Sequence, residues 1–160
     1  MQAEVLPQHQ WLQKLVGEWT CEMDCSMGPD QSRQKFTGTE SVRSIGGVWI
    51  QTEGHSQMPD GNMGTTVMTL GYNPLKQRFV GSFVGSMMTW FWLYDGQLDA
   101  GGKVLTLDSE GPSFSGDGSL SKYQDIIEWR SDDHRLLVSQ IPGPDGRWQE
   151  FMTAHYRRRK

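Results

Sequence analysis

The sequence predicts an all-β fold: an antiparallel up-and-down barrel of about ten strands, with one short N-terminal helix closing one end. Two observations predict it. The chain of 160 residues holds 19 glycines, 7 tryptophans and 6 phenylalanines, a composition that suits short strands joined by tight turns. Segments with a period of two also recur along the whole chain. Closing such a sheet into a barrel removes the long edges that would otherwise invite aggregation.

The first predicted element is a helix over residues 7–16. Pro7 suits the first helical position, and Gly17 suits the position just past the end. A helix of this length is ~15 Å long, about the width of the mouth of a small barrel. We therefore expect it to cover one barrel end with its apolar face, which consists of Trp11, Leu12, Leu15 and Val16.

A strand follows directly after Gly17, where the periodicity changes from helical to two. Trp19, Cys21 and Met23 alternate with the polar residues between them, which is the clearest strand pattern in the chain. Nine further strands are predicted from the same alternation and from the turn residues between them. They cover residues 34–43, 48–55, 65–71, 78–85, 88–98, 103–110, 120–130, 135–141 and 147–157.

Size and charge limit the classes of function. The length and the 36% of hydrophobic residues fit a single domain over residues 1–160. The net charge of −4 gives no reason to expect a nucleic-acid partner. No stretch approaches the ~20 apolar residues of a membrane span, and the first residues lack the pattern of a signal peptide. We predict a soluble, cytoplasmic protein without a membrane partner, and we find no motif for acyl or phosphoryl transfer.

Residues 89–94 lack the polar face that a solvated strand should have. Trp90, Trp92 and Tyr94 alternate with Thr89, Phe91 and Leu93, so apolar side chains point to both sides. We expect the first set to line the barrel interior. The second set would lie under a loop or against a second subunit, since exposed aromatic rows mark interfaces.

Two carboxylates interrupt faces that are otherwise apolar. Asp125 shares its predicted face with Tyr123, Ile127 and Trp129, and Glu150 shares its face with Trp148, Met152 and Tyr156. Burying a carboxylate costs several kcal/mol unless it is paired. Each is therefore either satisfied within the structure or placed for a ligand, unless a β-bulge turns it outward.

Four segments carry a family resemblance: HQWLQKLVGEW at residues 9–19, LGYNP at 70–74, GKVLTLDSEGP at 102–112 and FMTAHYRR at 151–158. In this order they resemble the bacterial family named domain of unknown function 1579. The resemblance implies a lipocalin-like, or calycin-like, antiparallel barrel. It implies no reaction and no catalytic residues.

The layout also resembles that of nitrobindin-like barrels, which hold haem through a histidine. The sequence shares Gly17 and Trp19 with them but lacks their glycine-rich continuation, so we expect no haem. His155 would be the first candidate for the iron ligand in such a barrel. The 4 histidines show no spacing typical of a metal site, and no metal or other cofactor is predicted.

We therefore predict a barrel that encloses a small apolar or aromatic ligand. One alternative is an enzyme in which the cavity carboxylates perform acid–base chemistry. Another is a homodimeric interaction module without a ligand. Binding is favoured over catalysis. The residues predicted to contact the ligand are Trp19, Trp90, Trp92, Tyr94, Tyr123, Asp125, Trp129, Trp148, Glu150 and His155.

Overall fold

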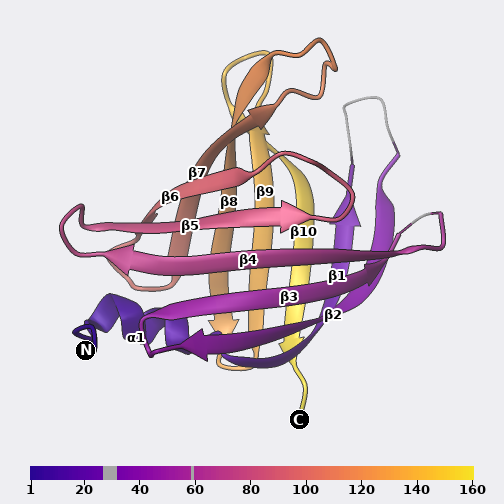
Figure 1. Ribbon diagram of the computed structural model, residues 1–160. Helices are drawn as coiled ribbons and strands as arrows, with labels where there is room; N and C mark the ends of the chain where they lie inside the picture. The colour runs from indigo at the N-terminus through magenta and orange to yellow at the C-terminus, as the bar shows by residue number, and fades with distance from the viewer. Residues whose placement is uncertain (27–31, 59) are drawn as a thin grey trace.

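A computed structural model describes residues 1–26, 32–58 and 60–160, in which one helix precedes ten strands (Figure 1). The helix, α1, covers Pro7–Gln13. The strands are β1 Gly17–Cys25, β2 Gln34–Ile45, β3 Trp49–Gln57, β4 Met63–Asn73, β5 Arg78–Gly85, β6 Trp92–Leu98, β7 Val104–Pro112, β8 Leu120–Ser131, β9 His134–Pro142 and β10 Trp148–Arg158.

The strands form a closed barrel in the order β1-β10-β9-β8-β7-β6-β5-β4-β3-β2. Each strand pairs antiparallel with its neighbour along the chain, and β1 closes the sheet against β10. The predicted up-and-down barrel is thus confirmed. Closure leaves no free sheet edge among these strands, which is the physical reason for preferring a barrel to an open sheet.

Helix α1 lies across one end of the barrel (Figure 1). Its side chains contact the β6–β7 connection and the end of β4: the Trp11 indole donates to the Gly102 carbonyl at 2.7 Å, and a ring nitrogen of His9 lies 3.1 Å from the Tyr72 carbonyl. The α-helical turns end at Gln13, earlier than the sequence predicts. The closing role predicted for the helix is confirmed.

Gly17 is required where the chain passes from the helix into β1. Its φ of +140° is one that residues with a side chain rarely adopt, and an added Cβ would lie 2.7 Å from Nη1 of Arg158. The same guanidinium donates to the Val16 carbonyl at 2.9 Å and to the Lys14 carbonyl at 3.0 Å. Arg158, at the end of β10, thus holds the segment that leads into β1 by hydrogen bonds.

The strand predicted over residues 88–98 begins later, at Trp92. The preceding residues connect β5 to β6, and this connection starts with a tight turn in which Met88 N–H donates to the Gly85 carbonyl at 3.2 Å. No glycine or proline follows Gly85 in this connection, so its apolar residues give the sequence pattern of a strand without forming one. Phe91 and Leu93 are 58% and 65% exposed, so their contact with a second subunit stays a prediction.

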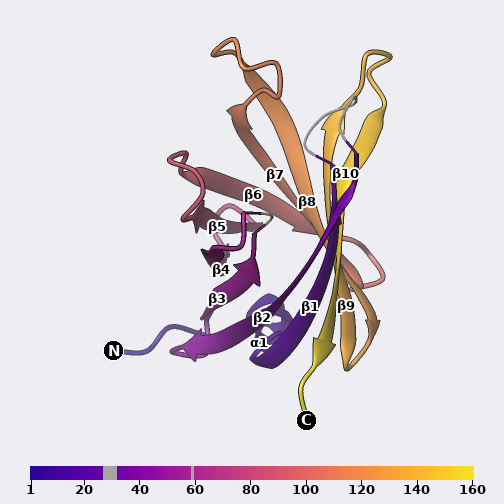
Figure 2. The same cartoon turned by 90° about the vertical axis from the view of Figure 1, so that its right-hand side faces the viewer.

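The barrel interior has two parts, which we term the closed half and the open half. In the closed half, next to α1, inward-facing side chains are almost completely buried: Leu15, Trp19, Ile50, Leu70, Phe79, Leu105 and Leu107. In the open half, at the other end of the same strands, Tyr94 and Tyr123 are buried. Other inward-facing side chains there are only partly buried: Met23, Phe36, Phe83, Trp92, Asp125 and Met152. Figure 2 shows the strands spreading apart at this end. Solvent therefore reaches the inner wall of the open half.

Candidate functional site

Three polar side chains, from β6, β8 and β9, meet inside the barrel. Tyr94 of β6 donates its hydroxyl to one carboxylate oxygen of Asp125 on β8. Ser139 of β9 donates its hydroxyl to the other oxygen at 2.5 Å. The alternation of each strand turns these residues inward, toward the apolar interior. We term them the Asp125 cluster.

The electrostatics of this cluster are dominated by burial. Burial raises the pKa of Asp125, while the hydroxyls of Ser139 and Tyr94 act in the opposite direction. Burial also raises the pKa of Tyr94 well above its usual value, and the neighbouring Asp125 adds to the shift. Among the described residues no cation forms an ion pair with Asp125. Its carboxylate therefore relies on neutral donors alone.

A second polar group lies deeper, at the boundary with the closed half. Arg135 of β9 and Glu40 of β2 form an ion pair, and their side chains are only 5% and 10% exposed. The guanidinium carbon of Arg135 lies 4.0 Å from the ring centroid of Tyr156 and 4.6 Å from that of Trp19. Such aromatic contacts stabilise a guanidinium away from water. The charges of Glu40 and Arg135 thus compensate each other.

Cys21 lies beside this pair and is not a nucleophile in the resting protein. Burial raises the pKa of its thiol to about 12, although a hydrogen bond with Tyr156 and the charge of Arg135 work against the shift. The thiolate is the reactive form of cysteine. Cys21 therefore stays protonated at neutral pH and contributes packing and a hydrogen bond.

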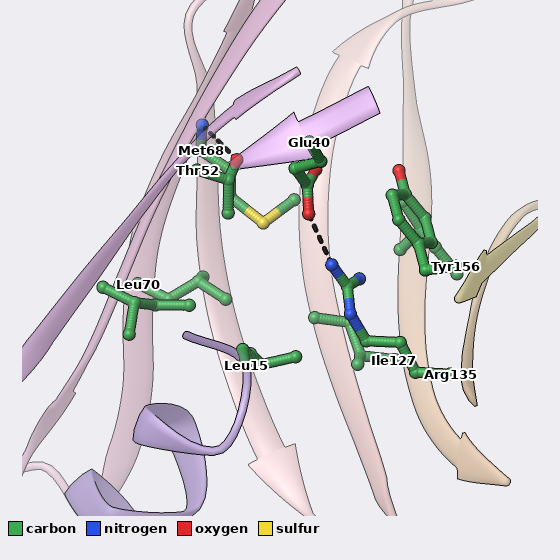
Figure 3. A pocket seen from close by; sticks show the side chains of 10 residues that line it. Leu15, Glu40, Thr52, Met68, Leu70, Ile127, Arg135 and Tyr156 are labelled. Carbon is green, nitrogen blue, oxygen red and sulfur yellow. Dashed lines mark hydrogen bonds and ion pairs between the residues drawn. The ribbon is translucent and has the colours of Figure 1, made fainter. Parts of the chain in front are cut away.

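The Glu40–Arg135 pair borders an internal cavity of about 20 Å³ (Figure 3). Roughly 10–15 Å³ is enough for a single water molecule, whereas sites for organic ligands measure roughly 300–1,000 Å³. The cavity therefore has room for a water and not for an organic ligand. It is lined by Leu15, Glu40, Ile50, Thr52, Met68, Leu70, Ile127, Arg135, Leu137 and Tyr156.

An aromatic cluster forms one wall of the open half. The ring of Tyr123 lies at its centre, 4.9 Å from Trp92, 5.9 Å from Phe114 and 6.0 Å from Phe151. The Trp92 ring lies against Gly111, where any side chain would collide with it. Glycine at this position of β7 thus gives the indole its place on the inner wall.

A groove of about 520 Å³ lies at the rim of the open half, on the side formed by β2 and β3. Phe36, whose register partner on β1 is the inward-facing Met23, contributes to its lining. The other lining residues of the groove are Gln34, Lys35, Thr37, Gln57, Met58 and Gly61. The surface available to a ligand therefore extends from the inner wall of the open half onto β2 and the end of β3.

The structure brings six of the predicted ligand-binding residues together in pairs. Tyr94 and Asp125 are hydrogen-bonded, Trp92 packs edge-on against Tyr123, and Trp19 lies 6.0 Å from Trp129. The first two pairs belong to the open half. The third belongs to the closed half, where the Trp19 indole donates to the Leu15 carbonyl at 2.9 Å.

The other four predicted residues lie at the rim or outside. Trp90 is 37% exposed in the β5–β6 connection and donates to the Glu110 carbonyl at 3.0 Å. Trp148 is 41% exposed. A register shift between Glu150 and Met152 reverses the face of β10, so Glu150 is exposed and its carboxylate accepts a hydrogen bond from the Thr153 hydroxyl. The prediction that Glu150 shares a face with Met152 is therefore wrong, and Asp125 and Glu150 do not meet.

His155 lies on the outer face of β10, where its ring stacks on that of His134 with 2.9 Å between two ring nitrogens. None of the 4 histidines of the chain lines the internal cavity. An iron held by His155 would sit outside the barrel, so the residues present do not fit a haem enclosed by it. Within the described ranges, no group of three or more His, Cys, Asp and Glu side chains could hold a metal ion.

Sequence reasoning missed Glu40, Arg135 and Ser139. Strand alternation carries the signal for all three: Arg135 and Ser139 share a face with Leu137, and Glu40 shares a face with Val42. A basic and an acidic residue at two inward positions predict a buried pair.

In the part of the chain that the structure describes, no helix is long and apolar enough to cross a membrane.

The comparisons with known proteins address the family and the fold. A family model described as "Protein of unknown function (DUF1579)" matches residues 4–158. No curated protein matches the sequence significantly.

Several solved structures share the architecture. Rv2717c from M. tuberculosis superimposes with a TM-score of 0.69 at 14% identity, over 98% of this chain and 100% of that chain. The S-type phycobiliprotein lyase CPES from Guillardia theta gives 0.60 at 12% identity, over 94% and 92%. EF1p2_mFAP2b, solved bound to DFHBI, gives 0.51 at 14% identity, over 95% and 99%. At these identities the likeness shows the fold alone.

Proposed function

Because the chain belongs to the DUF1579 family, which is described only as one of unknown function, we propose its function from the site: the open half binds a small ligand with an apolar or aromatic body. The observation that carries the proposal is the partial burial of inward-facing apolar side chains such as Phe83, Trp92 and Met152. Such side chains gain about 25 cal/mol for each Å² of apolar surface that a ligand covers.

The division of the interior supports this location. The closed half is filled by its own side chains, and its cavity has the size of a water molecule. The open half combines an aromatic wall with the Asp125 cluster, which suits a ligand with an apolar body and one polar group. One barrel of similar architecture was solved bound to the small molecule DFHBI. Enclosure, and no bond-making step, is the proposed mechanism.

The experiment compares two tryptophan substitutions on β7. Ser109 faces inward in the open half, and Glu110 is its exposed neighbour on the outer face. We expect Nile red, a neutral aromatic dye, to gain fluorescence with the wild-type protein and with Glu110→Trp. Ser109→Trp fills the open half and should weaken dye binding at least tenfold. Equal binding by both variants would show that the dye lies elsewhere and would reject the proposed site.

A further inference from the structure

Asp125 differs from the other charged groups of the barrel interior in having no opposite charge beside it. Glu40 and Arg135 neutralise each other, whereas the described partners of Asp125 are the two hydroxyls of Tyr94 and Ser139. Taking an ionised carboxylate out of water costs several kcal/mol unless it is paired. The open half therefore contains a carboxyl group that, when ionised, has no counter-charge among the described residues.

Resting on the proposed function, we propose that the ligand carries a protonated nitrogen, as in an amine or a basic heterocycle, that binds the carboxylate of Asp125. The pairing would supply the counter-charge that the barrel itself lacks. A charge-assisted N–H···O bond is also roughly twice as strong as a neutral one. The ligand class is thus a small organic cation with an apolar or aromatic body.

The geometry leaves the carboxylate able to accept such a donor. Ser139 occupies one lone pair of the first oxygen, and Tyr94 occupies one lone pair of the second. A carboxylate offers about four acceptor positions in all, so one remains on each oxygen. Asp125 is also only partly buried, although Tyr123 and Ile127 on either side of it on the same face are 5% and 2% exposed. A ligand would therefore approach this carboxylate from the open half.

The wall beside Asp125 suits a cation as well. Tyr123 precedes Asp125 by two positions on the same strand face, a spacing of ~7 Å, and its buried ring packs against Trp92, which is partly exposed to the open half. Aromatic faces attract ammonium and related cations when they lie within about 6 Å. The net charge of −4 adds a weak general attraction for positive ligands.

The test uses three naphthalene probes that share one body and differ in charge: 1-naphthylmethylamine, 1-naphthalenemethanol and 1-naphthoic acid. Calorimetric titration at pH 7 should show the wild-type protein binding the amine roughly tenfold more tightly than the alcohol, with the acid weakest. Asp125→Asn should reduce the preference for the amine to within about twofold. Asp108→Asn changes the net charge equally on the exposed outer face and should keep the preference.

A second variant guards against an effect of Asp125→Asn on folding. Tyr94→Phe keeps the carboxylate but removes one of its donors, so the preference for the amine should be retained or increased. Equal affinities for the three probes, abolished together by Ser109→Trp, would reject the cation and leave the interior site in place. An amine preference that survives Asp125→Asn would also overturn the inference, as would a failure of the amine to bind.

Discussion

The closed and open halves of the barrel are built from the same strands, yet they solve different physical problems. β1 carries Trp19 in the closed half, where it is 0% exposed, and Met23 in the open half, where it is partly exposed. β8 likewise carries Ile127, 2% exposed, beside the more accessible Asp125. The closed half therefore supplies packing energy, and the open half keeps surface that is still available for binding.

A small barrel can thus offer a surface for binding without a large internal cavity. Helix α1 and the Arg158 guanidinium seal one end, so the hydrophobic core can be completed there. Polar residues then mark the boundary, with the Glu40–Arg135 pair on one side and the Asp125 cluster on the other. Substitutions in the two halves should accordingly change different properties.

The largest expected effect distinguishes the halves by stability. Trp19→Ala empties a fully buried site and should lower the free energy of unfolding by about 4 kcal/mol. Trp92→Ala removes a ring that is still partly exposed and should cost less than about 2 kcal/mol. Urea denaturation monitored by circular dichroism measures both values. Equal losses would show that the two halves contribute alike to stability.

The next effect concerns the boundary. Glu40→Gln leaves the buried Arg135 guanidinium without its counter-charge and should lower the free energy of unfolding by about 3 kcal/mol. Replacing both partners, as Glu40→Leu with Arg135→Met, should bring stability back to within about 1 kcal/mol of the wild type. The same denaturation experiment applies. A harmless Glu40→Gln would mean that the pair is not buried as described.

Strand alternation is local, so it predicts the closed barrel and the inward side of most strands correctly. The bulge of β10 depends on how that strand registers with β9, which no local pattern records, and Glu150 is consequently misplaced. The Glu40–Arg135 pair joins residues 95 positions apart along the chain. Only closure of the barrel brings them together.

Tyr94 and Asp125 could be predicted from the sequence because each places a polar group on a strand face that is otherwise apolar. Trp19 was equally conspicuous, but its size suits a core as well as a ligand wall. The distinction depends on which end of the strand α1 covers. Sequence patterns thus predict which residues face inward. Whether an inward residue packs in the core or lines the open half depends on which barrel end helix α1 covers, and this is a property of the three-dimensional structure.

A smaller effect on stability is expected at Gly17, where the chain passes from α1 into β1 beside Arg158. Gly17→Ala forces a side chain onto a φ of +140° and toward the Arg158 guanidinium, so it should lower the free energy of unfolding by about 2 kcal/mol. Gly101→Ala is the matched control, because an added Cβ there meets only Asp99 at an ordinary 3.7 Å. A control effect as large as that of Gly17→Ala would remove the special role of the junction.

The smallest expected effect is a change in pH dependence that belongs to the open half alone. Burial raises the pKa of Asp125 above its unfolded value of 3.8. The native state therefore keeps its proton when the unfolded state has already lost it. By linkage, the stability contributed by this group is present below the unfolded pKa and is lost as pH rises through the native pKa.

Asp125→Asn removes this loss because the amide does not ionise. The stability of the variant relative to the wild type should therefore rise from about pH 4, near the unfolded pKa of aspartate, and become constant above the native pKa of Asp125. Denaturation curves between pH 3.5 and pH 8 measure the difference, and Asp108→Asn separates the effect of burial from that of net charge. A difference that stays constant over this range would show that Asp125 is as well solvated as an outer-face carboxylate. The open half would then hold no uncompensated charge for a ligand to neutralise.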